Sequence, residues 1–129
     1  MTGFKAILAH AVDSATGGLF GALVAYDGEI VDSYLSCREG LTTKEQKAQC
    51  AFISAHHGVI LKHVRTMLHS FHFGNTETLS FSYGDLRVGM TTLPENYFAV
   101  LACRATTPLA EAQNSLSQAR SHLRSEMGF

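Results

Sequence analysis

The stretch that decides the fold is GGLFGALVAYDGEIVDSYLS, residues 17–36. Its first half is an almost unbroken apolar run, Leu19 to Tyr26. In the second half, residues 30–35, polar side chains are interspersed with apolar ones, and the two sets of alternate positions face opposite sides of the strand. Between them, Asp27-Gly28 predicts a two-residue hairpin turn with positive φ at both positions. A strand that is apolar throughout is buried on both faces, whereas an alternating strand has one face in water or lies near a sheet edge. The pair therefore predicts a sheet with helices on both sides.

The rest of the chain predicts three helices and three more strands. Apolar residues at helical spacing precede Gly17-Gly18, and a threonine followed by Glu45 or Gln46 forms a possible capping box. The order helix, two strands, helix, three strands, helix predicts an α/β fold of the α+β kind with a five-stranded, mostly antiparallel sheet. The expected elements are a helix over 4–15, a long helix from Thr42 or Thr43 towards Gly74, strands over 77–84, 86–92 and 96–103, and a helix with Pro108 at its first position.

Length, charge and cysteine content limit the class of protein. The 129 residues and 46 % hydrophobic content fit a single domain, residues 1–129. A net charge of −1 offers no overall basic surface, which excludes nucleic acid as a main partner. The cysteines Cys37, Cys50 and Cys103 are odd in number and widely spaced, which favours free thiols in a reducing cytosol. The N-terminal residues resemble neither a secretory signal nor a membrane span, so we expect a cytoplasmic protein without membrane insertion.

The long helix carries more apolar surface than one sheet face uses. Its apolar arc covers about half the circumference, wider than the roughly 100° stripe of an ordinary surface helix. This width predicts that part of the helix pairs with a second copy of the chain, and a helix sunk in the core of one chain is the alternative. If His57 is packed there without an acidic neighbour, its charging in acid should loosen the dimer. The predicted dimer seam consists of Ile53, His57, Ile60, Val64, Met67 and Phe71.

Positive charge gathers on another face of the same helix. Residues 43–73 contain four Lys or Arg against Glu45 alone, a net charge of +3. Such a face suits the docking of an acidic partner, and a solvated helix face is the plainer alternative. The residues concerned are Lys44, Lys47, Lys62, Arg65 and His69.

Catalytic and metal-binding patterns are weak. Five of the seven histidines lie in or just after the long helix, but only His69 and His72 have the spacing of two zinc ligands, and no carboxylate or cysteine accompanies them. The sequence contains no GxxxxGK[ST], GxSxG or GxGxxG motif, and nothing singles out a nucleophile. We therefore expect a protein that is not an enzyme and that holds neither a cofactor nor a metal.

Residues 18–31, GLFGALVAYDGEIV, resemble the opening hairpin of Roadblock domains, in which a Gly-x-x-Gly, an apolar strand and an Asp-Gly turn occur together. The order of elements over nearly the whole chain is similar to theirs as well. The resemblance implies a long helix on one sheet face, the N- and C-terminal helices on the other, a central first strand and a second strand at the edge. Two features depart from the pattern: Asn96-Tyr97 stands where many members place a glycine, and histidines are frequent in the long helix.

The resemblance also implies a dimer and a class of partner. Roadblock proteins form homodimers or heterodimers by pairing their long helices and joining their third strands into one sheet, which adds Leu79 and Phe81 to the seam. An unpaired edge with an apolar face would otherwise favour aggregation. Members of the family serve as scaffolds or activators of small Ras-like GTPases and as subunits of dynein and lysosomal scaffold complexes. The basic residues of the long helix would then form the docking face.

Two functions fit these features. The first is a non-enzymatic dimeric adaptor or regulator that binds a small Ras-like GTPase, as an activator or as a scaffold partner. The alternative is a small-ligand sensor module of GAF, PAS or longin-like layout. A sensor needs polar residues that converge from the strands into a cavity. The corresponding positions here are instead expected to fill a core: Ala22, Val24, Phe98, Val100 and Ala102.

Overall fold

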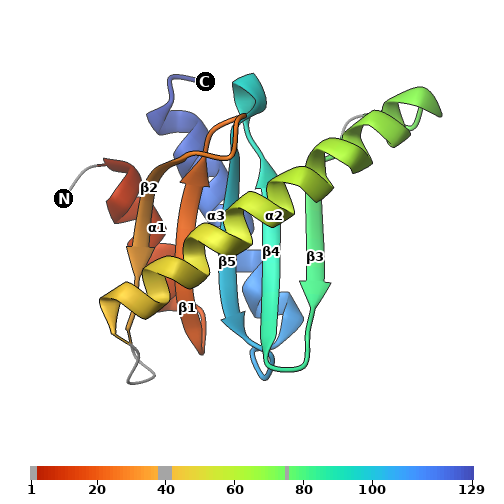
Figure 1. The fold of residues 1–129 in the computed structure, drawn as a ribbon. Helices are drawn as coiled ribbons and strands as arrows, with labels where there is room; N and C mark the ends of the chain where they lie inside the picture. Colours follow the sequence, from red (N-terminus) through yellow and green to blue (C-terminus); the bar gives the residue numbers. More distant parts are fainter. Residues whose placement is uncertain (1–2, 38–41, 75) are drawn as a thin grey trace.

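The helices and strands follow one another in the order that the sequence predicts. The computed structural model describes residues 3–37, 42–74 and 76–129, and Figure 1 shows their arrangement. The elements are α1 (Gly3–Ser14), β1 (Gly18–Val24), β2 (Ile30–Leu35), α2 (Thr43–Ser70), β3 (Thr78–Ser82), β4 (Leu86–Thr92), the short 3₁₀ helix η1 (Pro94–Asn96), β5 (Phe98–Arg104) and α3 (Leu109–Glu126).

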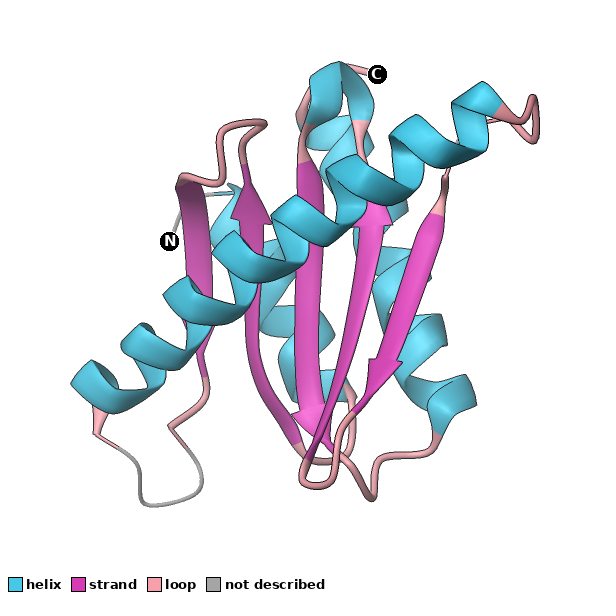
Figure 2. Cartoon of the chain, turned by 45° about the vertical axis from the view of Figure 1, so that its right-hand side comes forward, coloured by secondary structure: helices cyan, strands magenta, loops and turns pink. Residues whose placement is uncertain are grey.

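The strands form one sheet in the order β2-β1-β5-β4-β3, and each neighbouring pair is antiparallel. α2 crosses one face of the sheet obliquely, whereas α1 and α3 pack together on the other face (Figures 1 and 2). These observations confirm the predicted fold class and the layers that the resemblance implies. The edges are β2 and β3, as expected, but the central strand is β5, and β1 lies between β5 and the edge strand β2.

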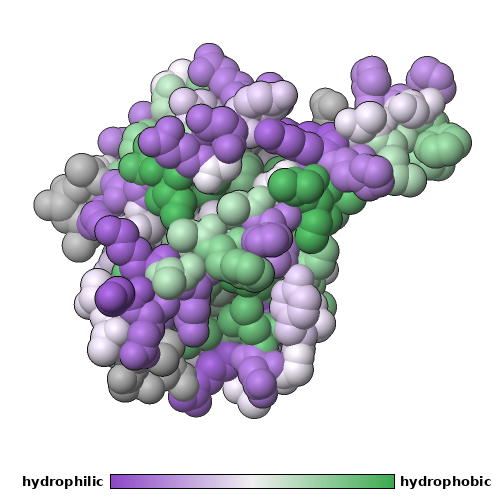
Figure 3. All heavy atoms as spheres, viewed as in Figure 1, coloured by the Kyte–Doolittle hydropathy of each residue, from purple (hydrophilic) through white to green (hydrophobic). Residues whose placement is uncertain are grey.

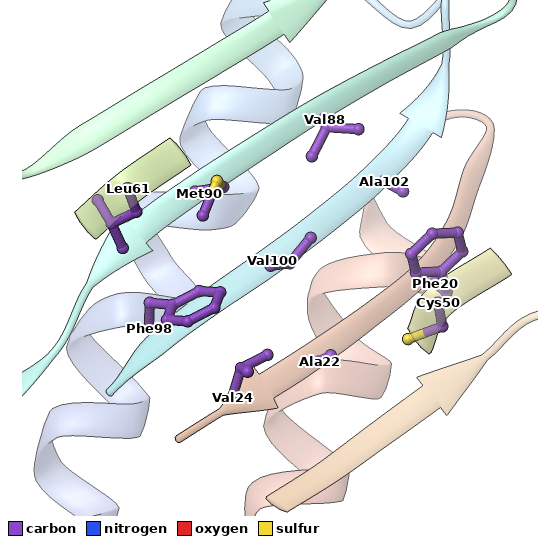
Figure 4. Close-up of a cluster of buried hydrophobic side chains, with 10 residues drawn as sticks. All are labelled: Phe20, Ala22, Val24, Cys50, Leu61, Val88, Met90, Phe98, Val100 and Ala102. Atoms are coloured by element: carbon purple, nitrogen blue, oxygen red, sulfur yellow. The ribbon is translucent and has the colours of Figure 1, made fainter. Parts of the chain in front are cut away.

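β1 is buried on both faces, as its apolar run predicts. Successive side chains of a strand point to opposite faces of the sheet. Phe20, Ala22 and Val24 accordingly belong to the core under α2, which Figure 4 shows, and Leu23 belongs to a second core against α1 and α3. The other predicted core residues, Phe98, Val100 and Ala102 of β5, fill the same space under α2.

The β1–β2 turn differs from the predicted two-residue turn. Gly28 has a φ of 89°, but Asp27 is not among the residues with positive φ. The Gly28 N–H donates to the Ala25 carbonyl oxygen (2.9 Å), and the Ala25 N–H donates to the Glu29 carbonyl oxygen (2.8 Å). This is the pattern of a type I turn followed by a left-handed glycine. Asp27 acts through its side chain, because its Oδ1 accepts from the Glu29 N–H at 3.0 Å.

The ends of the helices match the predicted signals in part. α2 begins with the capping box: the Glu45 N–H donates to Thr42 Oγ1 at 3.1 Å, and the Thr42 N–H donates to Glu45 Oε2 at 3.4 Å. α2 ends at Ser70, earlier than predicted, and His72 already has a left-handed φ of 61°. Pro108 is the N-cap residue of α3 rather than its first helical residue.

Candidate interaction surface

α2 packs one face against the sheet and exposes the rest. The packed face carries polar as well as apolar side chains, and the Gln46 side chain accepts a hydrogen bond from the Cys37 N–H at 2.8 Å. Beyond β3 the helix continues past the edge of the sheet, so its last turns have no strand beneath them (Figure 1). The buried residues of α2 are Gln46, Cys50, Ser54, His57, Gly58 and Leu61.

An apolar stripe runs along the outer side of α2. It consists of Phe52, Val59, Ile60 and Met67, whose side chains are 36–68 % exposed. At 3.6 residues per turn these four positions fall within an arc of about 100°. Figure 3 shows hydrophobic atoms across the middle of the molecular face on which α2 lies. Monomeric proteins rarely expose contiguous apolar surface of this kind, which marks the stripe as a candidate interface.

The stripe is continued at both ends. At the C-terminal end Phe71 and Phe73 form an aromatic arm, 65 % and 76 % exposed, with ring centroids 6.5 Å apart. At the N-terminal end an open groove of about 670 Å³ lies between α2 and the part of the sheet that the helix leaves uncovered. Leu19, Phe52 and Leu86 are among the apolar residues that line this groove.

The predicted dimer seam divides between the exposed and the packed faces of α2. Ile60, Met67 and Phe71 are exposed, as an interface requires. His57 is only 3 % exposed and Ile53 packs against the core under α2. Phe52 and Val59, which were not among the predicted seam residues, are more exposed than Ile60 and Met67. The seam was chosen from apolar character, and the buried polar residues Gln46 and Ser54 belong to the face of α2 that also turns Ile53 and His57 towards the sheet. The role of the seam in a dimer stays a prediction.

His57 is held inside the chain, between α2 and β3. Its Nδ1 lies 2.9 Å from the Ile53 carbonyl oxygen and its Nε2 lies 2.8 Å from the Tyr83 hydroxyl. A carbonyl can only accept, so Nδ1 donates and Nε2 accepts the Tyr83 proton. The ring also meets Phe81 edge-on, with centroids 4.8 Å apart. Burial is the main cause that lowers the pKa of His57, the Ile53 hydrogen bond opposes it, and the nearby His56 adds to it.

We expect the stability of the chain to depend on pH through His57. Because the folded state lowers its pKa, the unfolded state binds the proton more readily, starting near the ordinary value of 6.5. The contribution of His57 to the free energy of unfolding should therefore be fully present above pH 6.5. It should decrease as the pH drops towards 5, by up to about 1.4 kcal/mol per pH unit. Urea unfolding of wild type and His57→Gln across this range measures the effect. A wild-type profile parallel to that of the variant would show that His57 does not contribute.

β3 offers an edge next to the stripe. It pairs with β4 on one side, and its other side is an edge of the sheet. Leu79 and Phe81 are half-buried and pack against the core under α2, whereas Thr78, Ser80 and Ser82 are exposed. Leu79 and Phe81, which were predicted for the dimer seam, therefore pack against the core between α2 and the sheet. The part of β3 that can extend an interface is its backbone at the sheet edge.

The basic residues of α2 fall into two groups on a flank away from the apolar stripe. Lys44 and Lys47 are exposed at the N-terminal end, and about 22 Å of helix separate Lys47 from Lys62. The Lys62 Nζ lies 4.3 Å from the centre of the Tyr26 ring. Arg65 is half-buried, and burial lowers its pKa. His69 is exposed one turn further on.

The described residues form no group of three or more His, Cys, Asp or Glu side chains suited to a metal ion. His69 is on the last turn of α2, and His72 follows the end of the helix in a left-handed conformation. Burial raises the pKa of Cys50 and of Cys103 to about 11, so both thiols are protonated at neutral pH. No helix in the described part of the chain is long and apolar enough to cross a membrane.

Known proteins match this chain by structure. No family model and no curated protein matches the sequence. MglC from Myxococcus xanthus has 19 % identity and a TM-score of 0.75, over 97 % of this chain and 99 % of that one. A Roadblock/LC7 domain from Streptomyces avermitilis has 10 % identity and a TM-score of 0.79, over 97 % and 98 %. Myxococcus xanthus MglB has 11 % identity and a TM-score of 0.81, over 98 % and 96 %.

The chain has the Roadblock/LC7 fold. At these identities the likeness concerns the fold, and it extends over nearly the whole chain. The structure also accounts for the departure at Asn96-Tyr97. Glu95 and Asn96 have positive φ values of 61° and 65°, a region in which asparagine is better tolerated than most side chains. The turn into the last strand of this Roadblock/LC7 fold is thus made without the glycine that many members place there.

Proposed function

We propose that the chain forms a homodimer through α2 and that the dimer is a non-enzymatic adaptor for a small Ras-like GTPase. The observation that carries the first part is the apolar stripe on α2, which no other described segment of the chain covers. A neighbour with the same fold is described as MglB with a tetrameric arrangement, at 10 % identity. Self-association is therefore compatible with the Roadblock/LC7 fold.

The position of the stripe suggests how two copies meet. In a two-fold dimer the same surface is used by both chains, so residue i contacts residue j and j contacts i. The stripe is centred between Val59 and Ile60, so antiparallel helices place Phe52 opposite Met67 of the second copy. Phe71 lies about 17 Å along the helix from this centre, and Ala48 lies equally far on the other side. Phe71 of one copy therefore reaches Ala48 at the groove of the second copy. The arm and the groove thus become two ends of one interface.

The GTPase part of the proposal rests on the family resemblance and on the charge of α2. Lys44, Lys47 and Lys62 are exposed on a flank that the proposed dimer leaves accessible, with Arg65 and His69 beside Lys62. Positive charge of this kind steers an acidic partner and raises the association rate, and salt screens it over about 10 Å at 0.1 M. Arg65 is half-buried, so we propose that the protein orders the GTPase rather than supplying an arginine to its active site.

Binding of a small Ras-like GTPase from the same organism tests this proposal. The GTPase is loaded with GDP or with a non-hydrolysable GTP analogue, and its association rate is measured by biolayer interferometry. We expect Lys44→Gln/Lys47→Gln/Lys62→Gln to lower the association rate about tenfold at low salt and to flatten its salt dependence. The reason is the loss of three positive charges from the docking flank.

A matched control makes the same change in net charge on another surface of the molecule. Gln113→Glu/Gln118→Glu/Ser121→Glu changes the net charge by −3 on exposed positions of α3, on the opposite side of the sheet. It should leave the association rate close to that of the wild type. Equal rates for the lysine variant and the wild type would remove the basic flank from the proposal, and no binding of either loaded form would refute the GTPase as partner.

A further inference from the structure

A second hollow lies away from the apolar stripe, between the C-terminal part of α2, the η1 turn and α3. Its volume is about 650 Å³, and three arginines from two helices line it. We call it the arginine cavity, after Arg65 of α2 and Arg120 and Arg124 of α3. The pairing of two copies proposed above does not require it, so its role is a separate question.

The cationic groups are set deeper than the anionic ones. All three arginines are half-buried, whereas the two carboxylates of the lining, Glu77 and Glu95, are exposed at the rim. Among the described residues, none of these three arginines forms an ion pair with a carboxylate. Buried arginine is normally paired with an anion. The lining therefore supplies positive charge without a matching internal partner.

The hydrogen bonds that the arginines do make leave most donors unused. The Arg120 Nε donates to the Thr92 carbonyl oxygen at 3.0 Å, and the Arg65 Nη1 donates to Asn96 Oδ1 at 3.4 Å. A guanidinium has five N–H donors. These bonds fix the side chains across the hollow and leave further donors available.

Arginines occur near helix C-termini without any ligand, because a cation there offsets the helix dipole. Arg124 fits that explanation, because it lies in the last turn of α3. Arg65 and Arg120 do not, because they lie five and six residues before the ends of their helices and reach to other elements. The η1 turn that holds Asn96 against Arg65 contains two left-handed non-glycine residues, a costly conformation that often occurs at functional sites.

We propose that the arginine cavity binds the phosphate group of a small polar ligand. Planar guanidinium groups match the oxygens of a phosphate in two-point contacts, and the three arginines outnumber the two carboxylates at the rim, Glu77 and Glu95. The volume suits a metabolite-sized molecule. Thr66, Ser70 and Thr76 are also lining residues, and the Thr66 and Ser70 hydroxyls donate to the Lys62 and Thr66 carbonyl oxygens of α2. Thr76 Oγ1, in a side chain 6 % exposed, has no hydrogen-bond partner among the described residues. No Phe, Tyr or Trp side chain lines the cavity, and its one ring is the imidazole of His69, so a polar body fits better than a stacked base.

Calorimetric titration with glucose 6-phosphate, inorganic pyrophosphate and unphosphorylated glucose tests the proposal at constant ionic strength. We expect both phosphate probes to bind the wild type and glucose not to bind. Amide shifts in the NMR spectrum should cluster at β4 Thr92, at η1 and in α3 near Arg120. Absence of binding by both phosphate probes at millimolar concentration would overturn the proposal, as would equal binding of glucose.

Paired variants distinguish binding at the arginine cavity from an effect of the net charge of the protein. Arg65→Gln/Arg124→Gln should weaken pyrophosphate binding more than about tenfold, because two charge-assisted contacts are lost. Lys44→Gln/Lys47→Gln removes the same charge at the other end of α2 and should bind as the wild type does. Glu95→Gln should bind about two- to fivefold more tightly, because a repelling carboxylate leaves the rim. This gain does not depend on an impaired fold. Equal weakening by both double variants would reduce the effect to net charge and refute the site.

Discussion

We expect Val59→Asp/Ile60→Asp to convert the dimer into a monomer. Both side chains lie at the centre of the apolar stripe, where we propose that the two copies meet, and each appears twice in a two-fold interface. Burial of a large apolar side chain contributes about 1.5 to 3 kcal/mol, and an unpaired carboxylate adds a desolvation cost. The dissociation constant should therefore rise by more than about 1,000-fold. Sedimentation velocity at micromolar concentration measures the change.

Leu109→Asp is the matched control. Leu109 is 44 % exposed, comparable with the stripe residues, but it starts α3 on the opposite side of the sheet. A new carboxylate in the first turn of a helix is also favourable for that helix. This variant should remain a dimer. If Val59→Asp/Ile60→Asp sediments like the wild type while its circular dichroism is unchanged, the stripe is not the interface.

Gly18→Ala should destabilise the fold strongly. A Cβ at this position would overlap the Val12 carbonyl oxygen and would lie 2.9 Å from its carbon and 3.2 Å from the Ala15 carbonyl oxygen. These are backbone atoms, and the Gly18 N–H donates to Ala15 at 3.0 Å, so α1 and β1 cannot separate without losing contacts. We expect a loss of about 3 kcal/mol or more in the free energy of unfolding, at the upper end for overpacked sites.

Gly84→Ala is the control for this substitution. A Cβ there meets no atom within 4 Å, and the residue does not have a positive φ. Its effect should stay within about 0.5 kcal/mol of the wild type. Urea unfolding at one fixed protein concentration compares the two variants, because the stability of a dimer depends on concentration. A Gly18→Ala variant within about the same 0.5 kcal/mol would show that α1 does not press on β1 as described.

Local signals explain why much of the fold could be predicted. The apolar run of β1 reports two covered faces directly, and the Thr42–Glu45 capping box is a contact between residues three apart. The first glycine of the Gly-x-x-Gly stretch marks a close crossing of α1 over β1, and Gly21 marks another, since a Cβ there would lie 3.2 Å from Val12 Cγ2. Such features need no knowledge of distant residues.

The rotation of α2 could not be predicted in the same way. Hydropathy favours burying Ile60 and Met67 and exposing Gln46, yet Gln46 is buried and bonded to the Cys37 N–H. His57 is likewise buried because Tyr83, from a distant turn, satisfies its Nε2. A polar side chain becomes a core residue when a partner exists, and the partner is visible only in three dimensions. Because hydropathy does not show these partners, it does not show that Ile60 and Met67 face outward while Gln46 and His57 face the sheet.

The arginine cavity could not be predicted for a related reason. The sequence indicates Arg65 only as part of a basic helix face, and Arg120 and Arg124 were not among the predicted site residues. The spacing of four residues between those two places them on one side of α3, which was a usable signal. Their approach to Arg65, more than 50 residues earlier in the chain, depends on how α2 and α3 lie against opposite faces of the sheet and both border the same hollow.

Sedimentation equilibrium of the wild-type chain tests the central claim, dimerisation through α2, most directly. In our proposal the apolar stripe, the groove and the aromatic arm are covered by a second copy of the chain. At micromolar concentration we predict a mass of twice the 14.0 kDa of one chain, unchanged on moderate dilution. A mass of 14.0 kDa under the same conditions would contradict the claim, because the stripe would then be exposed in the protein as it exists in solution.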